Sequence, residues 1–367
     1  MVTILLILSV VVNILFLLPY IHYYVSNLYR RYFDKPFYNL EDEDSKIISS
    51  VLKASLSFKK GRMIQQEYKG LFIDLKKFFR PKRNSHIINN FYTAYLYVGL
   101  SQYALSYNDL QVVDYLKHKA NLWIDFKTNK LNYELKRIDQ YPIGILYINL
   151  FYLTKDTKYK LVADNIFNSL LAMRLSVKNN IIKYNDELDK YYVDALGMYI
   201  PFLMEYYRLT NNSLAKNIVV ENLNEYYRWG VDKETGIPTH GYNIRTKMKV
   251  GSANWGRGIG WYFLAKAYCK GIDLMDKGGV VEFPYTQFPC SSDHFDSSTA
   301  IMIELFKQSK SENSKLSIDF IKKHIRTNGL IDSCSGDTYG FNDYSHSFSE
   351  SEFCNGLFLL LISKFKN

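Results

Sequence analysis

The residue types best suited to chemistry gather between residues 251 and 261, which read GSANWGRGIGW. Arg257 lies between two glycines, and Trp255 and Trp261 are two of the chain's four tryptophans. A tryptophan ring offers a flat stacking face, and the planar arginine fork fits a carboxylate. Glycines let a ligand approach the backbone closely. The stretch indicates a site for a polar, acidic, ring-shaped ligand such as a sugar. A glycine-rich helix start with tryptophans in the core fits it equally well.

Acidic residues stand where apolar helices are expected to begin. They are Asp139, Asp194, Asp296 and Glu352. One interpretation makes them helix caps that satisfy free N–H groups and the helix dipole. The other gathers them around one cleft, which requires a scaffold that brings distant helix starts together.

Repeated helical hairpins are the predicted scaffold. Aromatic-rich apolar helices are followed by polar turns with N-cap residue types, at residues 106–109, 154–157, 210–213 and 310–314. The first helices of the pairs begin roughly 40 to 60 residues apart, as in helical-hairpin arrays. These starts lie near Ser85, Asp139, Asp194, Trp255, Asp296 and Glu352. A helix over residues 44–56 would supply the outer partner of the sixth. The sequence therefore predicts an all-α fold, an (α/α)6 barrel in which six inner helix starts surround one cleft.

The composition and charge of the chain limit the classes of partner that we expect. The chain has 367 residues, 47% hydrophobic, with a formal net charge of +10. The lysines are spread along the chain instead of forming the clustered stripe of a nucleic-acid-binding protein, so we expect no nucleic acid partner. No P-loop, H-E-x-x-H motif or zinc spacing is present, so we expect neither a cofactor nor a metal.

The first 25 residues are apolar and nearly uncharged, and they predict one transmembrane helix in contact with the lipid bilayer. Arg30, Arg31 and Lys35 follow it, and the positive-inside rule then favours a cytoplasmic soluble domain over an exported one. Residues 26–45 are predicted to be a juxtamembrane linker, and residues 46–367 the barrel domain.

Three motifs follow one another along the chain. Residues 191–203 contain Asp194 and end in Pro-Phe-Leu, residues 239–242 read Thr-His-Gly-Tyr, and residues 255–261 read WGRGIGW. In this order they resemble the unsaturated glucuronyl and rhamnogalacturonyl hydrolases of glycoside hydrolase families 88 and 105. Weaker similarities extend the resemblance from about residue 85 to the C-terminus, at residues 136–144, 296–300 and 354–360.

The resemblance implies a six-hairpin α/α barrel that hydrolyses an acidic sugar chain ending in a 4,5-unsaturated uronic acid. In that family an aspartic acid protonates the double bond, water adds at the neighbouring carbon, and the resulting hemiketal collapses. Asp194 matches this acid/base, and Asp139 matches the family's second carboxylate. Burial against aromatic rings would raise the pKa of such a carboxyl group into the working range.

The same resemblance implies a set of substrate-binding residues: His240, Tyr242, Trp255, Arg257 and Trp261. Arg257 is suited to the uronate carboxylate. His294 and His346 are further candidates because they fall in loops at the predicted cleft end.

An alternative function keeps the fold and changes the activity. A membrane anchor is unusual for a catabolic hydrolase and fits relatives encoded with capsule or exopolysaccharide synthesis. The protein would then be a membrane-associated biosynthesis factor that binds or processes glycan without unsaturated-uronyl hydrolase activity. A purely structural scaffold is a third possibility.

Overall fold

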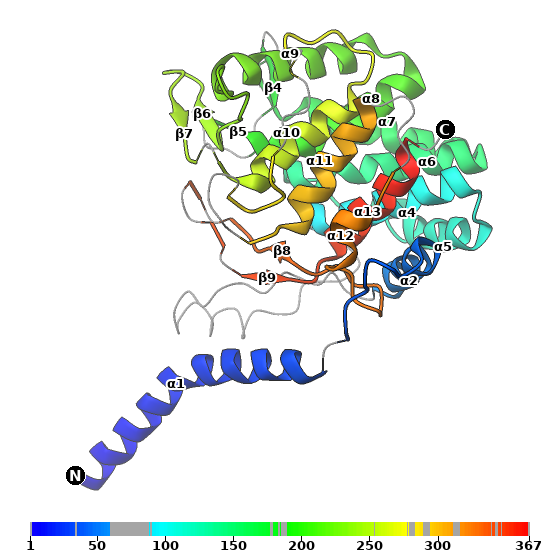
Figure 1. Ribbon diagram of the computed structural model, residues 1–367. Helices are drawn as coiled ribbons and strands as arrows, with labels where there is room; N and C mark the ends of the chain where they lie inside the picture. Colours follow the sequence, from blue (N-terminus) through cyan, green and yellow to red (C-terminus); the bar gives the residue numbers. More distant parts are fainter. Residues whose placement is uncertain are drawn as a thin grey trace.

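A computed structural model describes residues 2–33, 35–58, 88, 90–176, 179–182, 184, 189–252, 254–276, 278, 283–288, 294–310, 316–338, 340–341, 344–345 and 347–365. Most of these residues are helical (Figure 1).

Six of the described helices form a closed inner ring. They are α4 (Phe91–Tyr107), α6 (Gly144–Thr154), α8 (Val193–Thr210), α10 (Gly256–Tyr268), α11 (Ser297–Lys310) and α13 (Glu352–Lys364). Each packs on the next, and α13 returns to α4. In Figure 1, α10, α11 and α13 lie side by side. The predicted toroid of inner helices is therefore present, and its helices begin near the predicted positions.

A second set of helices packs outside this ring. It contains α2 (Asp44–Ser57), α5 (Leu110–Asn121), α7 (Thr157–Leu171), α9 (Ser213–Gly230) and the short α12 (Asp319–Lys322). Helix α2 contacts α13 and α4, as expected for the outer partner of the last hairpin. Between α10 and α11 the described residues form no helix. The fourth hairpin thus departs from the regular pattern in the part that the structure describes.

The turns between paired helices carry capping side chains, as their residue types predicted. Asp109, Asp156 and Asn212 each accept a hydrogen bond from a backbone N–H group at 3.0 or 3.1 Å and so cap α5, α7 and α9. Asn108 ends α4 in the left-handed conformation with φ of 51°, which asparagine tolerates better than most residues. The fourth predicted turn, residues 310–314, lies largely outside the described residues.

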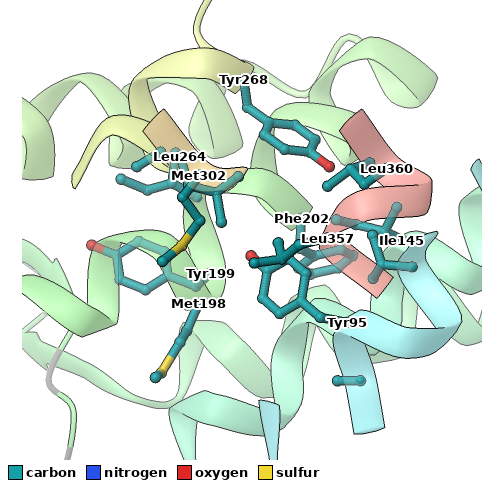
Figure 2. Close-up of a cluster of buried hydrophobic side chains, with 14 of the residues drawn as sticks. Tyr95, Ile145, Met198, Tyr199, Phe202, Leu264, Tyr268, Met302, Leu357 and Leu360 are labelled. Atoms are coloured by element: carbon teal, nitrogen blue, oxygen red, sulfur yellow. The ribbon is translucent and has the colours of Figure 1, made fainter. Parts of the chain in front are cut away.

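Side chains from all six inner helices meet inside the ring (Figure 2). The labelled residues are Tyr95, Ile145, Met198, Tyr199, Phe202, Leu264, Tyr268, Met302, Leu357 and Leu360. All ten are buried. Each fully buried side chain of this size contributes about 1.5–3 kcal/mol through the hydrophobic effect. This part of the ring is consequently packed core, which points to the helix ends as the place for a ligand.

Helices α4 and α13 approach each other at two glycines. A Cβ atom at Gly99 would overlap the carbonyl of Gly356, and one at Gly356 would overlap the carbonyl of Tyr95. The two backbones are therefore in contact, which only glycine permits. This contact closes the ring between its first and last inner helices.

Short strands, which an all-α prediction did not include, occur at the helix ends. They are β1 (Ile124–Asp125), β2 (Lys130–Leu131), β3 (Arg174–Ser176), β4 (Asn179–Ile182), β5 (Lys190–Tyr192), β6 (Gly241–Asn243), β7 (Lys249–Val250), β8 (Cys334–Ser335) and β9 (Phe348–Ser349). The pairs β1–β2, β3–β4 and β8–β9 and the triplet β5–β6–β7 are all antiparallel. A 3-10 helix, η1 (Ile138–Ile143), leads into α6.

The N-terminal apolar run forms helix α1 (Val2–Phe33). None of the described helices combines the length and the hydropathy needed to cross a bilayer, so the predicted transmembrane helix over residues 1–25 is not supported. The predicted domain boundaries and the cytoplasmic location stay predictions.

Candidate active site

Two of the predicted site residues are joined by a small sheet. Strand β5 leads directly into α8, whose second residue is Asp194. Strand β6 pairs with β5 and follows His240, and the Val193 N–H donates to the His240 carbonyl at 3.0 Å. The sheet therefore positions Asp194 beside the loop that carries His240.

Asp194 has the environment of a carboxyl group that holds a proton. Its Oδ1 atom is buried and accepts no hydrogen bond. Burial raises the pKa of Asp194 to about 7, and the charge of Arg257 only partly opposes this effect. Because a buried carboxylate loses its hydration, the neutral acid is favoured. Asp194 can consequently give or take a proton near neutral pH.

Asp139 lies in η1 and is also buried, but it is directly paired. Arg137 donates from Nε to Oδ1 at 3.1 Å and from Nη2 to Oδ2. Burial raises the pKa of Asp139, while the hydrogen bonds and charge of Arg137 lower it. The net direction is upward, although a guanidinium occupies both carboxylate oxygens.

Tyr184 shows that these groups belong to one cluster. Burial raises the pKa of its hydroxyl, and its electrostatic neighbours are Asp139, Asp194, Arg137 and Asp337. The Tyr184 ring also lies 5.6 Å from that of Tyr192, centre to centre, and Tyr192 precedes Asp194 by two residues. Asp139 and Asp194, which are 55 positions apart in the sequence, thus both act on the charge state of one phenol.

Arg257 is buried. Its Nη1 donates to the Ser335 carbonyl at 3.0 Å, and its Nη2 donates to the Gly336 carbonyl. The guanidinium carbon is 5.7 Å from the centre of the Trp255 ring. Arg257 is close enough to Asp194 to influence its pKa, but its two terminal nitrogens bind the last residue of β8 and the residue that follows it. This differs from the predicted contact with a substrate carboxylate.

His240 is a buried, neutral ring. Burial lowers its pKa to about 3, and the charge of Arg257 contributes in the same direction. The Nδ1 atom is 3.1 Å from the Tyr344 hydroxyl, and the ring lies 4.5 Å from the Trp255 ring, centre to centre. A ring that stays neutral across the physiological range can bind a ligand by hydrogen bonding but carries no charge for it.

The glycines of the central motif make room for protein atoms. A Cβ atom at Gly256 would overlap the Thr286 carbonyl, and one at Gly258 would lie 2.6 Å from the Trp255 ring. Trp255 itself is buried, and its Nε1 has no hydrogen-bond partner. The predicted close approach of a ligand to these glycines is therefore wrong, because the helix start is packed against neighbouring chain.

Trp261 packs in the hydrophobic core. Its ring lies 5.1 Å from Phe353 and 5.7 Å from Tyr95, centre to centre. A Cβ atom at Gly197 would overlap the Trp261 ring. The core interpretation accounts for Trp261, and the structure does not bring it into contact with the carboxylates.

The other described candidates, Tyr242 and His294, have different neighbours. Tyr242 is buried against Tyr191 and Tyr226, and its electrostatic neighbours are Glu225 and Arg228 of α9. Exposed His294 packs its ring 5.4 Å from Phe348. His346 lies outside the described residues.

Asp296 is a helix cap. It accepts hydrogen bonds from the backbone N–H groups of Ser298 at 2.9 Å and Thr299 at 3.3 Å, and one from the Ser335 hydroxyl. For this residue the capping interpretation is the right one.

The loop after β8 supplies site residues that the sequence did not reveal. Asp337 accepts a hydrogen bond from Tyr92 at the start of α4, and its charge acts on Asp139 and Arg257. Tyr344 joins His240 from the same loop region. Neither stands at a helix start, and only the density of serine, glycine, aspartate and aromatic residues between 333 and 348 could have indicated them. Among the described residues, no three His, Cys, Asp or Glu side chains are placed to hold a metal ion.

The sequence profile of Glycosyl Hydrolase Family 88 matches residues 62–280, more than half of the chain. The chain belongs to glycosyl hydrolase family 88. Membership supports a glycoside hydrolase with a glycan partner. No protein of curated function matches the sequence at a significant level.

Solved structures share the fold of this family 88 member. A possible family 105 member from Klebsiella pneumoniae has a TM-score of 0.68 at 12% identity, with 89% of this chain and 94% of that chain covered. A family 105 glycoside hydrolase from C. acetobutylicum gives 0.63 at 15% identity, covering 88% and 99%. An unsaturated glucuronyl hydrolase specific for heparin gives 0.56 at 13% identity, covering 88% and 97%. Identities this low show the six-hairpin glycosidase fold alone.

Proposed function

We propose that this family 88 member hydrolyses an oligosaccharide that ends in a 4,5-unsaturated uronic acid, with Asp194 as the acid and base. The buried Oδ1 atom of Asp194, which accepts no hydrogen bond, carries the proposal. Burial raises the pKa of this group to about 7, so about half of it is protonated at neutral pH. A catalyst that must both give and take a proton works best at such a pKa.

The reaction needs one proton and one water molecule. Protonated Asp194 gives its proton to carbon 4 of the double bond, and the positive charge that develops at carbon 5 is shared with the ring oxygen. Water adds at carbon 5 and returns a proton to the Asp194 carboxylate, so the acid is regenerated. The product is a hemiketal, which opens and releases the neighbouring sugar.

The remaining groups have supporting roles in this proposal. Asp139 is the second carboxylate, and both oxygens receive hydrogen bonds from Arg137. Neutral His240 and the buried Trp255 ring form one wall of the site, 4.5 Å apart. Arg257 holds the loop after β8 in place through two main-chain carbonyls.

Substitution of Asp194 by asparagine tests the mechanism. We expect Asp194→Asn to lower kcat at least about 1,000-fold, since general acid–base catalysis contributes about 100- to 10,000-fold. Turnover is followed by the loss of unsaturated-uronate absorbance with lyase-generated oligosaccharides. The wild-type kcat should fall as the pH rises through about 7, because the acid form is then lost.

A matched control is Asp164→Asn on α7, where the carboxylate pairs with Lys160 at 2.9 Å. It should keep full activity. Full activity of Asp194→Asn would contradict the mechanism. Wild-type protein that binds such oligosaccharides in calorimetry without any absorbance loss would favour a glycan-binding biosynthesis factor, and the absence of any binding would favour a scaffold.

A further inference from the structure

Two guanidinium groups belong to the site, and they are engaged very differently. Arg257 is 3% exposed, and both of its terminal nitrogens donate to main-chain carbonyls. The Arg137 side chain is 53% exposed, whereas that of its partner Asp139 is 1% exposed. Of these two guanidinium groups, Arg137 is therefore the one that combines a place beside Asp139 with a surface that a ligand can reach.

Asp139 orients the Arg137 guanidinium. The carboxylate accepts hydrogen bonds from Nε and Nη2, which fixes the plane of the fork and leaves Nη1 without a contact to Asp139. An arginine held in this way keeps donors in a fixed geometry for a second anion, and planar guanidinium groups favour carboxylates. Because Asp139 is fixed inside η1, less of the Arg137 side-chain entropy remains to be lost on ligand binding.

Arg137 is connected to the start of α8 through Tyr184. Its electrostatic neighbours include Asp139, Tyr184 and Asp337, and the Tyr184 ring lies 5.6 Å, centre to centre, from that of Tyr192, two residues before Asp194. Tyr184 thus joins the place where Arg137 would bind an anion to the helix start that carries Asp194. A substrate that carries its carboxylate next to the double bond needs these two places to be near each other.

We propose that Arg137 contacts the carboxylate of the acidic sugar and selects substrates that carry this charge, with Asp139 as its positioning residue. The proposal rests on the proposed function, because it assigns the acid-recognising group of that same site. It also differs from the role that the resemblance to known hydrolases implied for Arg257, whose terminal nitrogens are bound to the Ser335 and Gly336 carbonyls.

The experiment compares a charged substrate with its uncharged form. An unsaturated uronyl disaccharide and its methyl ester are assayed with wild type, Arg137→Gln and Arg137→Lys. The control is Arg228→Gln on α9, an arginine of similar exposure, 50%, that is also paired with a carboxylate, Glu225. KM and kcat are measured separately for both substrates.

For Arg137→Gln we expect KM for the acid to rise about 10- to 100-fold, the range for a charge-assisted hydrogen bond. KM for the methyl ester should stay within about 3-fold, so the preference for the acid is lost. Arg137→Lys keeps the charge without the fork and should lie between wild type and Arg137→Gln. Arg228→Gln should behave as wild type. A purely structural role of Arg137 would lower activity on both substrates equally.

The outcomes separate this proposal from the proposed function. If wild type hydrolyses the acid and Arg137→Gln keeps the full preference for it, the Arg137 proposal is overturned while the function stands. If Arg137→Gln does not fold, as judged by thermal melting, Arg137→Lys decides the same question.

If wild type hydrolyses neither substrate, the proposed function fails. Calorimetry with glucuronate and methyl glucuronate then decides the Arg137 proposal. Acid-selective binding that Arg137→Lys or Arg137→Gln weakens would support it, and no selective binding would overturn it.

Discussion

Two helix entrances of the same ring carry buried carboxyl groups, and they differ in one contact. At η1, Asp139 is held by two hydrogen bonds from Arg137. At the start of α8, Asp194 has a guanidinium nearby, that of Arg257, but one of its oxygens has no hydrogen-bond partner. Burial acts on both groups, and direct pairing offsets it at only one of them.

The difference teaches how similar carboxyl groups acquire different chemistry. Arg257 donates from its two terminal nitrogens to main-chain carbonyls, so its charge reaches Asp194 only through space. The pKa of Asp194 therefore remains raised to about 7. Because Arg257 is bonded to main-chain carbonyls and not to Asp194, the Asp194 carboxyl group can keep its proton near neutral pH.

The largest expected difference between Asp139 and Asp194 is in the effect of their substitution on kcat. We expect Asp139→Asn to lower kcat about 10- to 100-fold, against at least about 1,000-fold for Asp194→Asn, because the proposed mechanism assigns the proton transfer to Asp194 alone. Both variants are assayed on the same unsaturated disaccharide. A larger loss for Asp139→Asn would reverse the proposed roles of the two carboxyl groups.

The pH dependence of the free energy of unfolding should also differ between Asp194 and Asp139 variants. The pKa of Asp194 is raised to about 7 in the folded protein, so folding binds a proton and wild-type stability falls between about pH 4 and pH 7. Asp194→Asn removes this loss. The free energy of unfolding of the variant, relative to that of wild type, should therefore increase by about 3–4 kcal/mol as the pH rises from about 4 to about 8.

Urea unfolding at a series of pH values measures this gain. Asp139→Asn serves as the comparison and should show a smaller pH dependence, because Arg137 offsets part of the burial of Asp139. Equal pH dependence of the two variants would contradict the assignment of the unpaired acid to Asp194.

Asp296 stands at a third helix start, and its substitution is expected to have the smallest effect of those considered. Its carboxylate caps α11 through the Ser298 and Thr299 N–H groups. Asp296→Ala should cost about 1–2 kcal/mol of stability, the usual value of an N-cap. Asp296→Asn should recover most of this loss, since asparagine caps equally well, and thermal melting compares the two. A large loss of kcat with unchanged stability would instead place Asp296 in the chemistry.

Much of the scaffold was predictable from local patterns. Polar turns with Asp109, Asp156 and Asn212 mark helix boundaries because capping depends on neighbouring backbone groups. The apolar inner helices indicated burial on every side, which a closed ring provides. The membrane span predicted for the N-terminal segment is not supported, because none of the described helices meets the length and hydropathy that a span requires.

The sequence by itself determined which residues could take part. Asp194, Asp139 and His240 stand at helix starts or in a loop, and their types alone limit the chemistry to proton transfer and polar binding. Only the tertiary structure decided that Trp261 belongs to the core, that Arg257 serves the loop after β8, and that Asp337 joins the site. Pairing and burial depend on segments far apart in the chain, and they set the pKa of each carboxyl group, which no local pattern contains.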